Sequence, residues 1–244
     1  MQRTISAMVG KGSVNHNSRK FRAENVDGTR THLNIDYCNE NIKTVYHELF
    51  DEALERYNAK QIRSDRKIKD YYEKIRSSKQ EKPFHEIILQ VGGKGNMNAD
   101  TENGELAKQI LDEYYQGFQE RNPQLRVFSA HLHMDEATPH LHIDFVPFTT
   151  GSKRGLDTRV SLKQALATQG FKGGSRGDTE WSQWVQSEKE QLAAVMERYG
   201  IEWEHKGTHE KHLSVLDYKK QEREKEVAVL GAKIEQKQVE LESL

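Results

Sequence analysis

The stretch from His131 to Phe148 reads H-L-H-M-D-E-A-T-P-H-L-H-I-D-F-V-P-F and decides the fold. It holds four of the eleven histidines of the chain, in two segments where polar and apolar residues alternate. Alternation with a period of two is typical of a strand, so the stretch predicts two adjacent antiparallel strands connected by Met134 to Pro139. Because this connection is short, the sheet is not of the parallel, doubly wound type.

Three of these histidines are expected to lie together on one face of the strand pair. Residues two apart on a strand share a face, so His140 and His142 point the same way, and strand pairing brings His133 alongside them. Buried imidazoles need partners, and one divalent ion supplies a partner for all three rings. The pattern predicts a site for a first-row metal, with manganese, zinc, iron and nickel as candidates. We expect His131, on the same face, to be a neighbour of the site rather than a ligand.

Composition describes a soluble protein. Of the 244 residues 31% are charged, and the mean hydropathy is −0.91. No window approaches the roughly eighteen apolar residues of a membrane span, and the N-terminus lacks the apolar core of a signal peptide. Cys38 is the only cysteine, which makes an internal disulfide impossible. We therefore expect no membrane span and a cytoplasmic location.

The formal net charge of −1 conceals two basic segments. Residues 60–79 carry eight Lys and Arg against three Asp and Glu, and residues 151–177 carry six against one. Local basic stretches in a neutral chain indicate a face for a polyanion, although a solvated helix face would explain the first segment equally well. The six basic residues of the second segment are Lys153, Arg154, Arg159, Lys163, Lys172 and Arg176.

The remaining patterns predict strands interleaved with helices, an α+β fold in which helices cover one face of an antiparallel sheet and the histidines occupy the open face. Strands are predicted over residues 4–9 and 85–91, with a short edge strand within 29–37. Helices are predicted over 42–57, 60–79, 102–120 and 179–199, with a short helix capped by Ser161 and Gln164.

The C-terminal part changes character at Leu216, where apolar residues begin to follow an imperfect 3.5-residue ladder. We expect a globular domain over 1–200, a connector over 201–215 and the start of a helical, coiled-coil-like region over 216–244. Because the pattern stops without a cap, Gly or Pro, we expect the sequence to be truncated and the longer helix to support a homodimer. The apolar ladder consists of Leu216, Val227, Leu230, Ile234, Leu241 and Leu244.

Three ordered motifs resemble those of the Mob/Pre plasmid mobilisation relaxases, the MobV class. H-M-D-E-A-T-P-H-L-H at 133–142 resembles their H-x-D-E-x-x-P-H-x-H motif, H-N-S-R at 16–19 their H-N-x-R motif, and R-T-H-L-N at 30–34 the motif between them. The resemblance covers residues 1 to about 200. It implies the HUH-endonuclease architecture, an antiparallel palm of about five strands, and metal-dependent nicking and rejoining of one strand at a plasmid origin of transfer.

The same resemblance implies roles for individual residues. His133, His140 and His142 would bind the divalent ion, with manganese or magnesium expected. His16 would attack the scissile phosphate, leaving a 5′-phosphoryl-histidine and a free 3′-OH. Glu136 would orient His16.

Further residues are expected around this centre. Arg19 and Arg30 would contact the DNA, together with the six basic residues of 151–177. Asp135 is expected to cap the strand connection through backbone N–H groups. The partner implied is plasmid origin DNA, as single strand and hairpin.

A tyrosine nucleophile is the competing chemistry. Relatives often carry a tyrosine directly after the Asn of the middle motif, where this chain has Ile35, although Tyr37 is nearby. At pH 7 only about one part in a thousand of a phenol with pKa near 10 is ionised, whereas an imidazole is mostly neutral and nucleophilic. We therefore favour His16.

Two other functions remain open from the sequence. A rolling-circle replication initiator would need a tyrosine on the helix after the second histidine strand, and residues 179–199 offer one only at their end. A non-catalytic DNA-binding scaffold with a structural metal is the other. Three histidines without cysteine favour a site with open coordination positions, as catalytic sites have.

Overall fold

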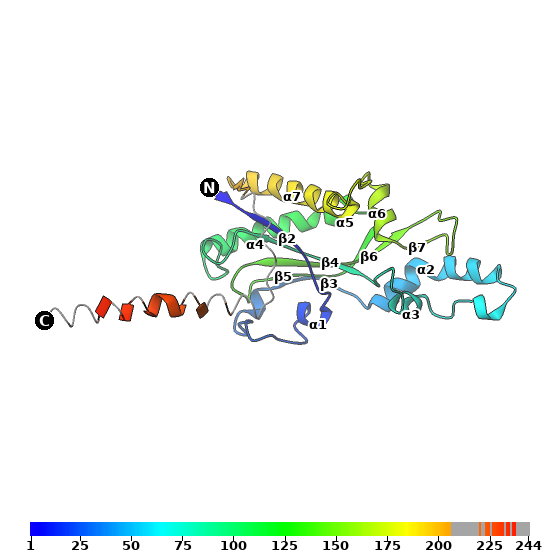
Figure 1. Ribbon diagram of the computed structural model, residues 1–244, viewed down its shortest axis with the longest axis horizontal. Coiled ribbons are helices and arrows are strands. Elements are labelled where there is room, and N and C mark those ends of the chain that lie inside the picture. The colour runs from blue at the N-terminus through cyan, green and yellow to red at the C-terminus, as the bar shows by residue number, and fades with distance from the viewer. Residues whose placement is uncertain (206–219, 221–222, 225, 232, 235, 238–244) are drawn as a thin grey trace. The chain divides into compact units, whose positions relative to one another are not determined.

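The computed structural model describes residues 1–205, 220, 223–224, 226–231, 233–234 and 236–237 (Figure 1). One compact unit runs from Met1 to His205 and a second from Lys206 to Leu244. The described residues of the second unit are helical, and Val227, Leu230 and Ile234 are exposed there. The rest of the predicted ladder, Leu216, Leu241 and Leu244, lies outside the described residues.

A six-stranded antiparallel sheet forms the centre of the first unit: five strands follow the order β2-β4-β6-β5-β3, and β7 pairs with the C-terminal end of β6, off this path. This confirms the predicted α+β class. The strands are β2 Ile5–Val9, β3 Ile35–Asn39, β4 His85–Val91, β5 Leu125–His133, β6 His140–Thr149 and β7 Arg159–Val160. The two histidine strands are neighbours, with His133 opposite His140 and His131 opposite His142.

One face of the sheet is apolar and lies under helices α4 (Glu102–Gln116), α6 (Leu162–Thr168) and α7 (Glu180–Arg198), which Figure 1 shows along one side of the strands. Leu141, Ile143 and Phe145 of β6 point into this core because alternate residues of a strand share a face. The helices follow from their own apolar stripes and caps. Thr179 and Ser182, for example, make a reciprocal capping box at the start of α7.

The other face of the sheet is not fully open, so the expectation of helices on one face only was wrong. Helices α2 (Ile42–Ala59) and α3 (Tyr71–Arg76) pack in a second core that includes Val146 and Phe148 of β6. These two residues follow His140, His142 and Asp144 on the same side of the strand. This side of β6 is polar at His140 and apolar at Phe148. Helices α2 and α3 therefore cover the Phe148 end, and α1 (Val14–Asn17) lies at the His140 end.

Several predicted boundaries differ from the observed ones. Residues 60–79 are not one helix. Before α3 they contain only two apolar residues, Ile62 and Ile68, and Ile62 is fully exposed, so this part has no apolar stripe to pack against a core. The chain makes only a 3-10 turn at Ser64–Arg66, and α3 starts where Asp70 caps it. The helix predicted over 102–120 breaks at Gly117 into α4 and α5 (Phe118–Arg121).

Two short segments were also misjudged. The edge strand begins only at Ile35, after a 3-10 turn over Thr31–Leu33. The expected connector begins with β8 (Glu202–Trp203), which pairs in parallel with β1 (Gln2–Arg3). Among the described residues, no helix combines the length and the apolar character that crossing a membrane requires.

Candidate metal centre and active site

Strands β5 and β6 bring three histidine rings to one point. The nitrogen atoms that His133, His140 and His142 can offer to a metal lie within 4.8 Å of one another, and their ring centroids are 4.7–5.2 Å apart. The trio is almost entirely buried, with 1–9% of each residue exposed. The histidine-bearing end of the sheet is therefore a preformed cluster rather than a set of surface rings.

Backbone carbonyls determine the tautomers of two rings. Nε2 of His133 lies 2.8 Å from the carbonyl oxygen of Asn17, and Nδ1 of His140 lies 2.8 Å from that of Thr138. A carbonyl oxygen can only accept, so these two nitrogens carry the protons. The remaining nitrogens, Nδ1 of His133 and Nε2 of His140, face each other across 3.4 Å with lone pairs only.

The third ring completes the same arrangement. Nδ1 of His142 donates to the carboxylate of Glu86 at 2.6 Å, and its Nε2 is buried without a hydrogen-bond partner. Burial lowers the pKa of His142 to about 4 despite Glu86, and burial together with the neighbouring rings holds the pKa of His133 well below its usual value. Three rings whose nitrogen atoms converge within 4.8 Å of one another fit a divalent cation.

Glu86 on β4 is a site residue that sequence reasoning missed. Its carboxylate accepts from His142, from Nδ2 of Asn17 at 2.8 Å and from the Gly12 amide at 2.7 Å. Burial opposes its ionisation, but these hydrogen bonds outweigh burial and lower the pKa of Glu86. A Cβ at Gly10 would overlap the same carboxylate, so the chain after β2 needs glycine there. The signal was a lone acid within the apolar strand H-E-I-I-L-Q-V.

The N-terminal segment reaches the trio, as the family motifs imply. The ring of His16 on α1 lies 6.1 Å from that of His133 and 6.3 Å from that of His142. Asn17 docks the segment, because its Nδ2 donates to both Glu86 and Asp144 at 2.8 and 3.0 Å while its carbonyl accepts from His133. All three anchoring partners belong to the central strands.

Arg19 and Glu136 flank His16. Nε2 of His16 lies 3.5 Å from Oε1 of Glu136 and 3.3 Å from Nη1 of Arg19, and Nη2 of Arg19 donates to the same carboxylate at 2.9 Å. Burial raises the pKa of Glu136, but His16, His140 and Arg19 together hold it well below its ordinary value. Glu136 is therefore an ionised acceptor beside His16 at neutral pH.

We expected Asp135 to cap the strand connection through backbone amides. Its carboxylate instead accepts hydrogen bonds from side chains. Its carboxylate accepts from Nε of Arg19 at 2.9 Å, Asn34 at 2.8 Å and Thr31 at 3.0 Å. Arg19 has φ +55°, the one left-handed non-glycine residue in the described part of the chain. This conformation is unfavourable for a residue with a Cβ, and Asp135 is the partner that holds it.

The contacts of Tyr37 and His131 exclude both residues from the candidate chemistry. The Tyr37 hydroxyl donates to Asp112 at 2.7 Å on the helix-covered face, and burial raises its pKa, so Tyr37 is remote from the trio and poorly suited as a nucleophile. His131 bonds Asp36 and Ser129 through its two ring nitrogens, at 2.6 and 3.2 Å. It has no nitrogen free for a metal.

The basic residues predicted to bind DNA are spread more widely than expected. Arg30 is half-buried at the start of the 3-10 turn before β3. The six basic residues of 151–177 follow β6 in the chain. Thr149, the last residue of β6, is nine residues and roughly 30 Å from His140. Lys153 and Arg154 are exposed in the loop after β6, Arg159 is half-buried on β7, Lys163 is on α6, and Lys172 and Arg176 are exposed before α7.

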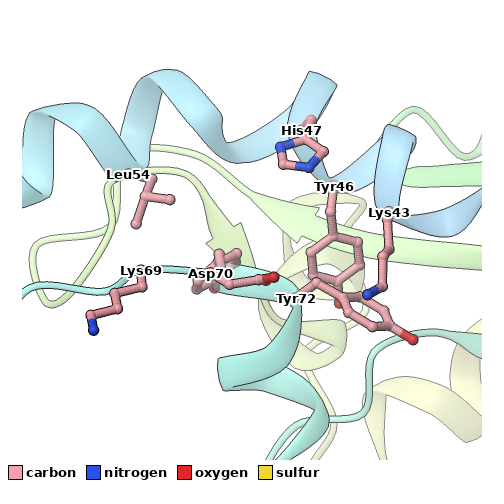
Figure 2. A pocket seen from close by; sticks show the side chains of 8 residues that line it. Lys43, Tyr46, His47, Leu54, Lys69, Asp70 and Tyr72 are labelled. Atoms are coloured by element: carbon pink, nitrogen blue, oxygen red, sulfur yellow. The ribbon is translucent and has the colours of Figure 1, made fainter.

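A small cavity of ≈ 80 Å³ lies between α2 and α3 and is lined by Lys43, Tyr46, His47 and Tyr72, among others (Figure 2). Neither His16 nor the trio contributes to it. Asp70 in this cavity is occupied as the cap of α3, and Nζ of Lys43 lies 5.2 Å from the centre of the Tyr72 ring. We therefore place the active site at the histidine end of the sheet and not here.

Sheet and cluster together define an α+β protein with a three-histidine cluster that could hold a metal, beside an N-terminal histidine. The family model described as plasmid recombination enzyme (Mob_Pre) matches residues 13–220. The chain belongs to this family, the plasmid recombination enzymes.

Two relatives of known family are similar to this chain in sequence. A plasmid recombination enzyme of Bacillus sp. is 25% identical over 238 residues, which cover 95% of this chain and 48% of the relative. A plasmid recombination enzyme type 2 of Staphylococcus aureus is 26% identical over 235 residues, covering 94% and 47%. The chain thus spans about half the length of these relatives.

Solved structures share the fold. The MobM relaxase domain, in Mn-bound complexes with plasmid pMV158 oriT DNA, superposes with TM-scores of 0.53 and 0.54 at 20% identity. These matches cover 89% of this chain and 98–99% of the MobM domain.

Proposed function

We propose that the domain over 1–200 is a metal-dependent relaxase that nicks one strand of plasmid origin-of-transfer DNA and can rejoin it, which would initiate conjugative mobilisation. The observation that carries this proposal is the approach of His16 to within 6.1–6.3 Å of two rings of a trio that lies over a hundred residues later. In the same cluster, Nε2 of His142 is buried without a hydrogen-bond partner.

In the reaction that we propose, a ring nitrogen of His16 bonds to phosphorus and the P–O3′ bond breaks. The 3′-oxygen leaves with the electron pair and takes a proton from solvent, giving a free 3′-OH and a 5′-phosphoryl-histidine. Glu136 holds the proton on Nε2 and stabilises the positive charge that develops on the ring, while Arg19 fixes Glu136. A divalent ion on the trio, manganese or magnesium, would polarise the scissile phosphate.

The alternative functions gain less support. A replication initiator needs a tyrosine near the trio, but α7 packs on the opposite face, and its nearest tyrosine, Tyr199, is bonded to Glu113. A structural metal site usually has four protein ligands, whereas the group that could hold an ion here offers three histidines.

The covalent step is tested with His16→Ala and a labelled single strand that carries the origin. We expect no covalent adduct on a denaturing gel, because Ala offers no nucleophile. His47→Ala, which removes an exposed histidine of α2, is the control and should form the adduct like the wild type. An adduct with the His16 variant would overturn the nucleophile assignment, and mapping the adduct by mass spectrometry would identify the true one.

We also propose that the helical residues described between 220 and 237 pair two copies of the chain. Val227, Leu230 and Ile234 are exposed at helical spacing and would form the seam. Light scattering that finds a monomer with the full-length protein would reject this.

A further inference from the structure

Phe21 is the one exposed aromatic side chain among the described residues, with 61% of its surface accessible. It belongs to neither apolar core and packs against neither of them. The other phenylalanine, tyrosine and tryptophan side chains of 1–205 are buried or half-buried. Most of the Phe21 ring is therefore available for contact with a ligand.

The backbone places Phe21 next to the candidate nucleophile. The Phe21 amide donates to the carbonyl of Asn15 at 2.9 Å, and the Arg19 amide donates to that of His16 at 3.0 Å. The left-handed Arg19 turns the chain back, so Phe21 returns to the residue that precedes His16. The backbone of Phe21 therefore lies beside that of the residue before His16.

The charge around Phe21 is suited to a polyanion. Lys20 and Arg22 on either side of it are exposed. A nucleotide of a single strand fits this surface. Its phosphate can lie next to the cations, and its flat base can stack on the ring. A base inside a duplex is already stacked on its neighbours and offers no face to an exposed ring.

We propose that Phe21 is a stacking platform for one base of single-stranded DNA. That this base neighbours the cleaved phosphate rests on the function proposed above, whereas the stacking itself does not. Stacking on one aromatic ring contributes a sizeable part of single-strand affinity and tolerates any base, because every base has a π face. Phe21 would hold the strand while the pairing of other bases is undone.

The test measures the binding of a labelled mixed-sequence single strand by fluorescence anisotropy, with EDTA present so that no chemistry occurs. Phe21→Ala should weaken binding about 5- to 150-fold, the equivalent of about 1–3 kcal/mol per stacked base. Phe21→Leu, of similar bulk without the ring, should lose as much, and Phe21→Trp should bind like the wild type. Ile62→Ala, at a fully exposed apolar residue between α2 and α3, should change nothing.

An oligonucleotide of the same length built from abasic sites separates stacking from charge. Wild type and Phe21→Ala should bind it equally, since it offers phosphates and no base. Equal affinity of the two proteins for the normal strand, an equal loss on both oligonucleotides, or full binding by Phe21→Leu would each overturn the proposal. Adduct formation by wild type and His16→Ala is scored separately, so a failure of the proposed function is distinguishable from a failure of stacking.

Discussion

At the scale of single residues, the candidate metal centre depends on which nitrogen of each ring is already used. His133 and His140 donate a hydrogen bond to backbone carbonyls, and His142 donates one to Glu86. Each ring is left with one lone pair that points toward the others. A partner of this kind orients a ligand and makes it more basic, so Glu86 should act on metal affinity although it would not touch the ion.

Removing that partner is the first prediction at this scale. Glu86→Ala should weaken Mn²⁺ binding about 10- to 100-fold, as loss of a hydrogen-bonded carboxylate behind a histidine ligand typically does. Isothermal titration calorimetry on the purified protein measures this. Glu86→Gln keeps an acceptor for Nδ1 of His142 and should lose less. Glu120→Ala, on the exposed side of α5, is the matched control, and equal affinity of the Glu86 and Glu120 variants would contradict the role.

At the scale of elements, a buried polar network joins the helices behind the sheet. Glu188 of α7 is 3% exposed and accepts from Tyr114 of α4, from Nδ2 of Asn122 at 2.9 Å and from Arg121 at 3.2 Å. Asn122 in turn accepts from Nε1 of Trp184 at 2.7 Å. A buried carboxylate with three donors holds α7 in register against α4 and α5, and through them against the apolar face of the sheet.

Glu188→Ala should therefore be strongly destabilising. Deleting the acceptor leaves buried donors and the Arg121 charge without a partner, which typically costs about 3–5 kcal/mol. The free energy of unfolding in urea measures the loss. Glu190→Ala, two residues away on the exposed side of the same helix, should stay within about 0.5 kcal/mol of the wild type. Similar losses for both variants would mean that the network contributes little.

His85 at the start of β4 predicts a pH dependence of stability. Burial, with a smaller effect of Lys82, lowers its pKa to about 4, and its ring lies 6.1 Å from that of Trp181. The unfolded chain binds a proton near the ordinary pKa of about 6.5, whereas the folded chain does not, so stability falls as pH decreases from about 6.5 to about 4.

The comparison that isolates this effect uses His85→Phe, which keeps a ring against Phe145 and Trp181. Between pH 7 and pH 5 the wild type should lose on the order of 1 kcal/mol more stability than the variant, because only the wild type gains a proton on unfolding. Urea unfolding at both pH values gives the two differences. An identical loss in both proteins would show that His85 is protonated as easily in the folded state.

At the scale of the whole molecule, the basic loop after β6 and the candidate active site lie far apart. The loop after β6, with Lys153 and Arg154, is roughly 30 Å from His140 along the strand. Any DNA that contacts both must extend over several nucleotides. We therefore expect these residues to bind phosphates well away from the one that His16 would attack.

Salt dependence of binding tests this expectation. Replacing Lys153 and Arg154 by Gln should reduce the slope of log affinity against log salt by about 2, one for each phosphate that the variant no longer neutralises. The same double change at Lys67 and Lys69, in the exposed loop before α3, decides whether the first basic segment is only a solvated surface. An unchanged slope for Lys153 and Arg154 would refute their role.

Much of the site was predictable from local pattern, and the failures have identifiable causes. The trio follows from strand alternation, which requires only neighbouring residues. Glu86 and Asp144 escaped notice because a carboxylate acts on a site through partners that are distant in sequence. The prediction of one helix over residues 60–79 was wrong because a run of charged residues looks like the exposed face of a helix. This run lacks the apolar stripe that a packed helix needs.

The sequence by itself determined the histidine strands, the helices with strong apolar stripes and the family of this protein. These depend on periodicity and on motifs, which are properties of short segments. Only the tertiary structure decided that α1 lies against the trio, that α2 and α3 cover the far end of the histidine face, and that Phe21 remains exposed beside His16. The physical reason is that docking rests on buried hydrogen bonds from Asn17 to Glu86 and Asp144, partners separated from it by 69 and 127 residues.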